Sequence, residues 1–226
     1  MVELQSSKLV MRVRFPLPAP IMNVSYTHNA ILWLPQRTAS RTIAGMFLGY
    51  NFINTEHNTP LEGENFYTHD LGFPPNTENF DLICTVRNPY SWLLSVWHWD
   101  NFYPGVAEKD RISFAEYVKR QQWELIGFSN HIVNANIKYL IRYESIKQDL
   151  AKIPWFNINR PEVNYRLTHN GCMSENLIRT ENMTSDYLKY YTEKEFSIVN
   201  TKLSDLFDKL GYIKISCNHS NQPPLV

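Results

Sequence analysis

Two short segments combine arginines with hydroxyl side chains directly after an apolar run, a combination suited to binding phosphate or sulfate. In the first, the apolar run Ala30–Pro35 leads into a loop and an expected helix, which brings Arg37, Thr38, Ala39, Ser40, Arg41 and Thr42 to one strand end. Backbone N–H groups at a helix N-terminus are unpaired and partly positive, and arginines add charge-assisted hydrogen bonds. An ordinary N-cap made by Thr38 or Ser40 is the alternative interpretation. The GxxxxGK[ST] lysine is missing, which argues against an ATP-dependent kinase.

The second segment is DLICTVRNPYSWLLSVWHWD, where an apolar run again leads into a helix. Asn88 suits the N-cap and Pro89 the first helical position, so Arg87 is expected at the strand end. Ser95 follows about two helical turns later, roughly 9 Å from the first turn, so Arg87 must curl alongside the helix to share a ligand with it. Taken alone, the pair also fits a surface arginine and a serine inside a helix.

Together the two segments resemble the two nucleotide-binding signatures of the sulfotransferase family. The 5′-phosphosulfate loop of that family reads Pro-Lys/Arg-x-Gly-Thr/Ser, and here Arg37 falls on the basic position, Ala39 on the glycine, and Ser40 and Arg41 on the hydroxyl positions. The 3′-phosphate signature reads Arg-Asn-Pro with a serine eight residues after the arginine, which matches Arg87 and Ser95. IRYESI and the stretch from YTEKEF to LGY resemble two further family segments, so the similarity spans about Ile31 to Tyr212.

The resemblance implies a P-loop-like three-layer α/β domain and 3′-phosphoadenosine 5′-phosphosulfate as the donor substrate. The loop at 37–42 would hold the sulfate and the 5′-phosphate, with Arg37 also taking part in catalysis. Arg87 and Ser95 would hold the 3′-phosphate, and Tyr143 would contact adenine. The implied reaction is in-line, metal-independent transfer of a sulfuryl group to an acceptor hydroxyl, with carbohydrate favoured as the acceptor.

Several positions depart from the family pattern. Gln36 is an extra residue between Pro35 and Arg37, and Ala39 stands where a glycine is expected. Arg41 replaces a hydroxyl, and Thr42 occupies the place of an adenine-stacking aromatic ring. The third 3′-phosphate element, a basic loop near the C-terminus, has no clear match, and its candidates are Arg160 and Arg166.

A general base for the acceptor proton is expected at His69, 18 residues before Arg87. In several branches of the family a Thr-His segment at this place supplies the catalytic histidine, and an ordinary histidine pKa of about 6.5 suits the role. The alternative for His69 is a loop histidine capped by Asp70. His98 is the competing base, and Glu62 or Glu64 would take the role if this chain follows the glutamate-using branches.

Apolar runs alternate with helical patterns along the chain, which predicts an α/β domain with a mainly parallel central sheet and helices on both faces. We expect strands at 30–35, 81–86 and 138–142. Helices are expected at 41–50, 90–102, 113–123, from 142 to about 153, and at 192–210. Ser113 is the expected N-cap of the third helix, Gly211 is expected to end the last one, and residues 157–182 are expected to form a polar loop.

The domain is expected to span 22–216, with a flexible tail over 217–226. Residues 1–21 lack a signal-peptide layout and any helical or strand period, so we expect a disordered arm or an upstream extension of the reading frame before Met22.

Composition narrows the classes of function. Lysine plus arginine and aspartate plus glutamate balance at 22 each, so broad electrostatic capture of nucleic acid is not expected. Three cysteines give neither a disulfide framework nor zinc spacing, and no run reaches the roughly 18 apolar residues of a membrane helix. We therefore expect a cytoplasmic protein without metal or membrane insertion. A nucleotide-dependent kinase on a similar fold, or a non-catalytic module that binds a nucleotide or glycan, are the alternatives.

Overall fold

In the computed structural model the chain is an α/β protein built on one mixed sheet. The structure describes residues 23–54, 59–60, 77–102, 106–121, 132–169 and 187–216. Six strands lie in the order β4-β3-β1-β2-β5-β6. Their bounds are β1 Asn23–Ser25, β2 Ala30–Trp33, β3 Ile53–Asn54, β4 Thr59–Pro60, β5 Asp81–Val86 and β6 Tyr139–Arg142.

The expectation of a mainly parallel sheet is wrong. β2 pairs with β5 and β5 with β6 in parallel, but β1 pairs antiparallel with β2 and β3, and β3 antiparallel with β4. The reason lies in the connection from β1 to β2, a turn over residues 26–29 in which Asn29 has a φ of 48°. A turn this short joins antiparallel neighbours, whereas a parallel crossover needs a dozen or more residues.

The parallel half of the sheet, β2, β5 and β6, is made by the three apolar runs that the sequence predicts. Every residue of β2 is buried, and in β5 only Asp81 is partly exposed. Side chains alternate between the two faces of a strand. Ile31 and Trp33 therefore join one hydrophobic cluster, while Leu32 and Leu34 join the other.

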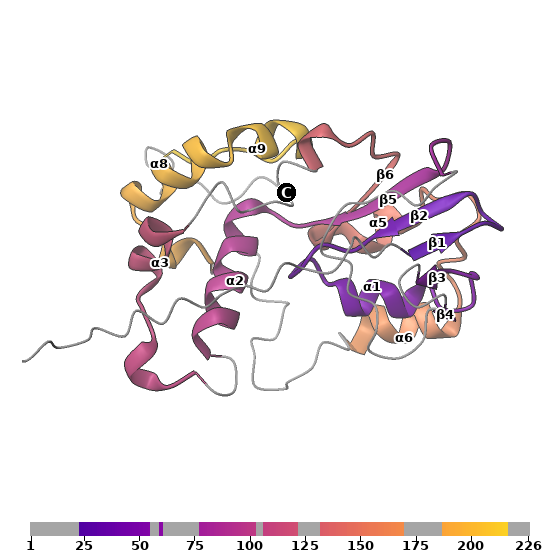
Figure 1. Cartoon of the computed structure of the whole chain (residues 1–226), viewed down its shortest axis with the longest axis horizontal. Coiled ribbons are helices and arrows are strands. Elements are labelled where there is room, and N and C mark those ends of the chain that lie inside the picture. Colours follow the sequence, from indigo (N-terminus) through magenta and orange to yellow (C-terminus); the bar gives the residue numbers. More distant parts are fainter. Residues whose placement is uncertain are drawn as a thin grey trace, which may run out of the picture.

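Helices follow the parallel strands on opposite faces of the sheet. The cluster that includes Trp33 and Val86 packs against α2 (Pro89–Phe102), α3 (Phe114–Arg120), α8 (Glu193–Lys202) and α9 (Ser204–Leu210). The other cluster packs against α1 (Ser40–Met46), α5 (Ile146–Leu150) and α6 (Pro161–His169). Figure 1 shows α1 and α6 side by side, well apart from the group formed by α2, α3, α8 and α9. Thus the loop after β2 and the loop after β5 lead to opposite faces.

The helix boundaries confirm most of the expected stop and start signals. The Asn88 side chain accepts the Tyr90 N–H at 3.0 Å, with Pro89 opening α2, and Ser113 caps α3 by accepting the Glu116 N–H at 3.2 Å. Gly211 ends α9 in the left-handed conformation, with φ 73°. The single helix expected over 192–210 is instead two, because Leu203, at φ −114° and ψ 22°, leaves the helical region between α8 and α9.

One helix falls where the sequence predicts a loop. α6 occupies residues 161–169 of the segment expected to be irregular, and the rest of that segment beyond residue 169 lies outside the described residues. Pro161 opens the helix at a position where a missing N–H costs nothing. Only Val163 among its first residues is fully buried, so its apolar face is too narrow to give a clear helical period.

The expected flanking segments at 1–21 and 217–226 also lie outside the described residues. Over the described ranges, no helix combines the length and the apolar character needed to cross a membrane.

Candidate functional site

The candidate site lies where the carboxyl ends of β2, β5 and β6 meet. In open α/β sheets, ligands bind at this edge, in the crevice between neighbouring strands whose following helices go to opposite faces. β2 and β5 meet this condition, since α1 and α2 belong to different hydrophobic clusters. The loop after β2 carries Arg37, and the residue after β5 is Arg87, so the two arginines come from the two sides of this crevice.

The loop between β2 and α1 is closed by its own hydroxyl groups. Thr38 Oγ1 donates to the Pro35 carbonyl at 2.6 Å and lies 2.6 Å from Thr85 Oγ1 of β5. Ser40 Oγ donates to the same carbonyl at 2.5 Å. Neither side chain caps α1, so the N-cap alternative for Thr38 and Ser40 is wrong. Both hydroxyls would have to turn to donate to a ligand.

Two residues of this loop have a left-handed backbone. Arg37 has a φ of 66°, and Ala39, the N-cap of α1, has φ 65° and ψ 29°. For residues with a Cβ atom this conformation costs about 1–2 kcal/mol, while glycine adopts it readily. Ala39 thus has the backbone that favours glycine, at the position where the pattern that the sequence resembles has a glycine.

Arg87 is a buried arginine held by three contacts. Its side chain is 8% exposed, and its Nε donates to Ser91 Oγ at 3.0 Å. Nη1 donates to the carbonyl oxygen of Arg37 at 3.4 Å, and the guanidinium lies 4.4 Å from the centre of the Tyr143 ring. The end of β6 therefore closes the site on the side of β5 that is away from β2.

Arg37 crosses from its loop to the outer side of α2. Its Nε donates to Ser95 Oγ at 3.2 Å, and its guanidinium lies 4.8 Å from the centre of the Trp99 ring. Ser95 thus contacts Arg37, whereas Arg87 reaches Ser91, one helical turn earlier. The structure brings Arg37, Arg87, Ser95 and Tyr143 into one connected cluster.

Glu144 connects three segments that carry the sequence resemblance. Its carboxylate accepts the Asn88 N–H at 2.9 Å and the Tyr212 hydroxyl at 2.7 Å. Burial, together with the Glu144 charge, raises the pKa of Tyr212 above its ordinary value. Burial and then the Glu144 charge also raise the pKa of Tyr187, while the nearby Arg87 acts in the opposite direction. Glu144 therefore links β6, the start of α2 and the end of α9 beside Arg87.

Of the candidate bases, only His98 belongs to the described residues. Its imidazole is half-buried on α2, with its ring centre 4.8 Å from that of Phe102. Burial of the ring and the positive charge of Arg37 lower the pKa of His98, which favours the neutral, proton-accepting form. His69, Glu62 and Glu64 lie outside the described residues, so their position relative to the cluster stays a prediction.

The other arginines that the sequence singled out, Arg41, Arg160 and Arg166, lie along α1. Arg41 is half-buried and Thr42 is buried in the first turn. Arg160 donates to the Leu48 carbonyl at 2.8 Å and lies 4.9 Å from the Tyr50 ring centre, beyond the far end of α1. The Arg166 guanidinium packs on Gly45 so closely that a Cβ there would lie 2.1 Å from its carbon. Neither candidate for a third 3′-phosphate contact joins the Arg37–Arg87 cluster.

Sequence reasoning missed four side chains of the site: Thr85, Ser91, Trp92 and Trp99. The Trp92 indole donates to the carbonyl of Gln36 at 3.0 Å, so α2 binds the extra residue of the loop directly. The sequence did carry a signal for Ser91 and Trp99, since Arg87, Ser91, Ser95 and Trp99 follow one another at intervals of four residues. Such a spacing places side chains on one face of a helix.

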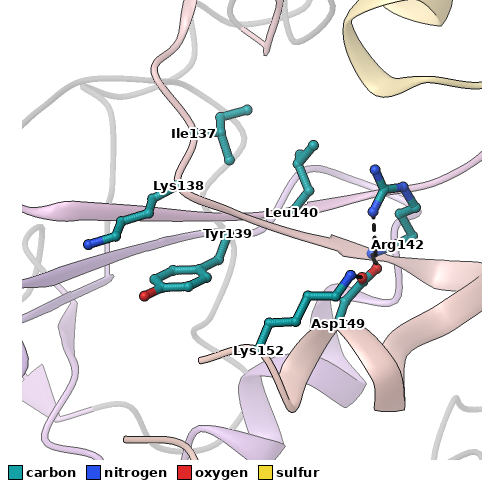
Figure 2. A pocket seen from close by; sticks show the side chains of 7 residues that line it. All are labelled: Ile137, Lys138, Tyr139, Leu140, Arg142, Asp149 and Lys152. Atoms are coloured by element: carbon teal, nitrogen blue, oxygen red, sulfur yellow. Dashed lines mark hydrogen bonds and ion pairs between the residues drawn. The ribbon is translucent and has the colours of Figure 1, made fainter. Parts of the chain in front are cut away.

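A separate hollow of about 220 Å³ lies beside β6 and α5. Figure 2 shows Arg142 and Lys152 converging there on Asp149, with Lys152 Nζ 2.5 Å and Arg142 Nη1 3.5 Å from its carboxylate. None of the residues of the Arg37–Arg87 cluster lines it. Among the residues that the structure describes, no group of three histidine, cysteine, aspartate or glutamate side chains could hold a metal ion.

Comparison of the chain with models of protein families, with curated proteins and with solved structures finds no match.

Proposed function

We propose that this chain is a sulfotransferase that moves a sulfuryl group from 3′-phosphoadenosine 5′-phosphosulfate to an acceptor hydroxyl. The observation that carries the proposal is the meeting of Arg37 and Arg87 on one face of α2, where Arg87 donates to the Arg37 carbonyl and Arg37 to Ser95. Two guanidinium groups from adjacent strand ends suit a ligand with two separate anionic groups. A hydrophobic core on each face of the sheet also supports a P-loop-like three-layer arrangement.

In this proposal the donor extends from Arg87 towards Arg37. Arg87, together with Ser95, takes the 3′-phosphate, and Tyr143 lies beside it for the adenine. Residues 37–42 take the 5′-phosphate and the sulfate. The burial of Arg87 supports its role, since a hydrogen bond to a charged group is worth about 1.5–3 kcal/mol and gains strength away from water.

The proposed chemistry is an in-line displacement at sulfur. The acceptor oxygen forms a bond to sulfur while the bond from sulfur to the 5′-phosphate oxygen breaks, and the electron pair of that bond leaves with the phosphate. Arg37 would stabilise the negative charge that develops on this oxygen. His69 would take the acceptor proton, with His98 as the alternative base because its neutral form is favoured beside Arg37.

A carbohydrate is the acceptor that we favour. Phe102, at the end of α2, and Tyr190, beside Trp97, expose 42% and 40% of their surfaces. Partly exposed aromatic rings combine an apolar face with access to solvent, which suits contact with sugar rings.

The proposal is tested by thermal unfolding with and without 3′-phosphoadenosine 5′-phosphate, the desulfated product. A ligand at about 100 times its dissociation constant should stabilise the fold by roughly 2.7 kcal/mol. Magnesium should add nothing to this effect. Protection by ATP with magnesium but not by the bisphosphate would favour the kinase alternative. Bisphosphate binding without transfer to any of a panel of hydroxyl compounds would favour a non-catalytic module, in which Gln36 and Ala39 mark a loop that has lost its activity.

A further inference from the structure

The loop that carries Arg37 is attached at several separate points to β5, to α2 and to Arg87 between them. The Trp92 indole fixes the carbonyl of Gln36, and Arg87 donates to the carbonyl of Arg37 itself. Behind the loop, the Thr38 hydroxyl meets Thr85 of β5. These contacts fix the main chain on both sides of Arg37, including its left-handed backbone at φ 66°. They leave the direction of the long side chain to be set by other groups.

Ser95 and Trp99 both contact that side chain. The Ser95 hydroxyl accepts from Nε at 3.2 Å, and the Trp99 ring lies 4.8 Å from the guanidinium carbon. A hydrogen bond through Nε still allows the guanidinium plane to rotate about it, whereas a ring beneath the guanidinium carbon limits that rotation. A cation–π contact is electrostatic and requires no hydrogen bond from the Nη groups, whose N–H donors suit an anionic ligand.

From this geometry we infer that Trp99 is a positioning residue, which orients the Arg37 guanidinium so that its N–H edge meets the transferring group of the donor. The effect on turnover rests on the proposed function. The orientation of Arg37 by Trp99 does not rest on the proposed function, because it can be measured without any ligand.

His98 provides that independent measurement. It precedes Trp99 on α2, and the charge of Arg37 helps to lower its pKa, after burial. Charged groups nearby among the described residues include Arg111, whose guanidinium lies 4.9 Å from the Phe102 ring centre, and Asp100, which accepts from the Tyr117 hydroxyl. If Trp99 holds Arg37 in place, loss of the ring should release this charge and raise the pKa of His98.

The first experiment is an NMR pH titration of the His98 imidazole, assigned with His98→Gln. Trp99→Leu should raise the pKa of His98, and Trp99→Phe, which keeps an aromatic face, should leave it close to the wild-type value. Arg37→Gln should raise it as well, because the charge itself is gone. In the Arg37→Gln background, Trp99→Leu should then have no further effect. An equal rise from Trp99→Leu in both backgrounds would overturn the inference, since it would mean that the ring acts only by shielding His98 from water.

The second experiment uses turnover with a screened acceptor and binding of the bisphosphate. Trp99→Leu should lower kcat by about 3- to 30-fold, the range that a cation–π contact represents, and should change the bisphosphate Kd by less than about twofold. Trp99→Phe should recover most of the rate. Tyr26→Leu is the control, because Tyr26 is an exposed aromatic residue in the turn before β2, at the opposite end of that strand from the Arg37 loop; it should leave kcat unchanged.

The two experiments separate the two ideas. A wild-type chain that the bisphosphate does not stabilise refutes the proposed function, and the titration of His98 still decides whether Trp99 holds Arg37. If the bisphosphate binds and the acceptor turns over, an unchanged kcat in Trp99→Leu refutes the positioning role. An equal loss of rate with and without Arg37 refutes it too.

Discussion

Ala39 offers a test of the phosphate-binding loop that needs no ligand. It is the N-cap of α1 and has a left-handed backbone, with φ 65° and ψ 29°. Its carbonyl accepts the Ile43 N–H at 3.0 Å, the first hydrogen bond of the helix. The loop on its other side is tied to β5 through Thr38 and Thr85. Since both ends are fixed, the residue cannot relax to a right-handed conformation without breaking one of these contacts, and we predict that Ala39→Gly stabilises the protein.

The expected gain is a difference between two terms. Left-handed backbone costs a residue with a Cβ atom about 1–2 kcal/mol, and glycine avoids this cost. Glycine also makes the unfolded chain more flexible, which costs about 0.4–1 kcal/mol. Ala39→Gly should therefore raise the free energy of unfolding by about 0.5–1 kcal/mol. For a domain of this size, that corresponds to a rise in Tm of roughly 1–4 °C.

The assay is thermal unfolding of the wild type and two variants by circular dichroism. Ala115→Gly is the matched control, because Ala115 lies inside α3 in right-handed helical conformation and is also partly buried. The same chemical change there should destabilise the fold by about 0.5–1 kcal/mol. If Ala39→Gly lowers Tm as Ala115→Gly does, the argument from backbone strain at residue 39 is refuted.

Four further predictions follow from the site and its surroundings. Arg87→Ala should weaken bisphosphate binding by about 1.5–3 kcal/mol and abolish the preference for the 3′,5′-bisphosphate over adenosine 5′-phosphate in calorimetric titration; a retained preference would mean that the 3′-phosphate binds elsewhere. Ser95→Ala should weaken the same binding by about 1 kcal/mol and also lower kcat, since Ser95 contacts Arg37; an unchanged kcat would separate it from Arg37. His69→Ala should cut turnover by about 10²–10⁴-fold with bisphosphate stabilisation intact, and the wild-type rate should fall below about pH 6.5; near-normal turnover would transfer the role to His98, Glu62 or Glu64. Burial tends to raise the pKa of Asp149, but hydrogen bonds from Lys152, the Arg142 N–H and Ser145 hold that pKa below its ordinary value. The stabilisation that Asp149 contributes is therefore present above its unfolded pKa and is lost as the pH falls through its folded pKa. In urea unfolding, Asp149→Asn should lower the free energy of unfolding by about 1–3 kcal/mol at neutral pH, and this difference from the wild type should become smaller in acid; a difference independent of pH would contradict the prediction.

The sequence predicted those parts of the fold that have strong local signals. The strands β2, β5 and β6 coincide with apolar runs, and Asn88, Pro89, Ser113 and Gly211 mark helix ends by their own chemistry. β1, β3 and β4 have no such signal, because they are only two or three residues long and owe their position to pairing with β2 and with one another. The antiparallel half of the sheet was therefore missed.

Within the site, the sequence predicted that Arg37 and Arg87 lie together, but not which side chains they contact. Arg37 follows β2 and Arg87 follows β5, and these strands pair with each other in parallel, so the proximity of the two arginines follows from topology. Trp92 and Trp99 were missed, because a tryptophan on a helix carries no mark of whether its ring faces the core or a neighbouring loop. Only the folded loop, with its extra residue Gln36, shows that the Trp92 indole has a partner there.

The position of Ser95 bears on how the two ends of the proposed donor site communicate. Under the proposed function, Ser95 binds the 3′-phosphate, and its hydroxyl oxygen also accepts from Arg37 at 3.2 Å. A hydroxyl can accept from Arg37 and donate to a phosphate oxygen at the same time, because it has one proton and two lone pairs. Phosphate at Ser95 would then polarise the hydroxyl oxygen and strengthen its bond to Arg37. Occupation of the 3′-phosphate position would thereby help to hold the arginine that acts on the sulfuryl group, so the far end of the nucleotide would contribute to turnover as well as to affinity.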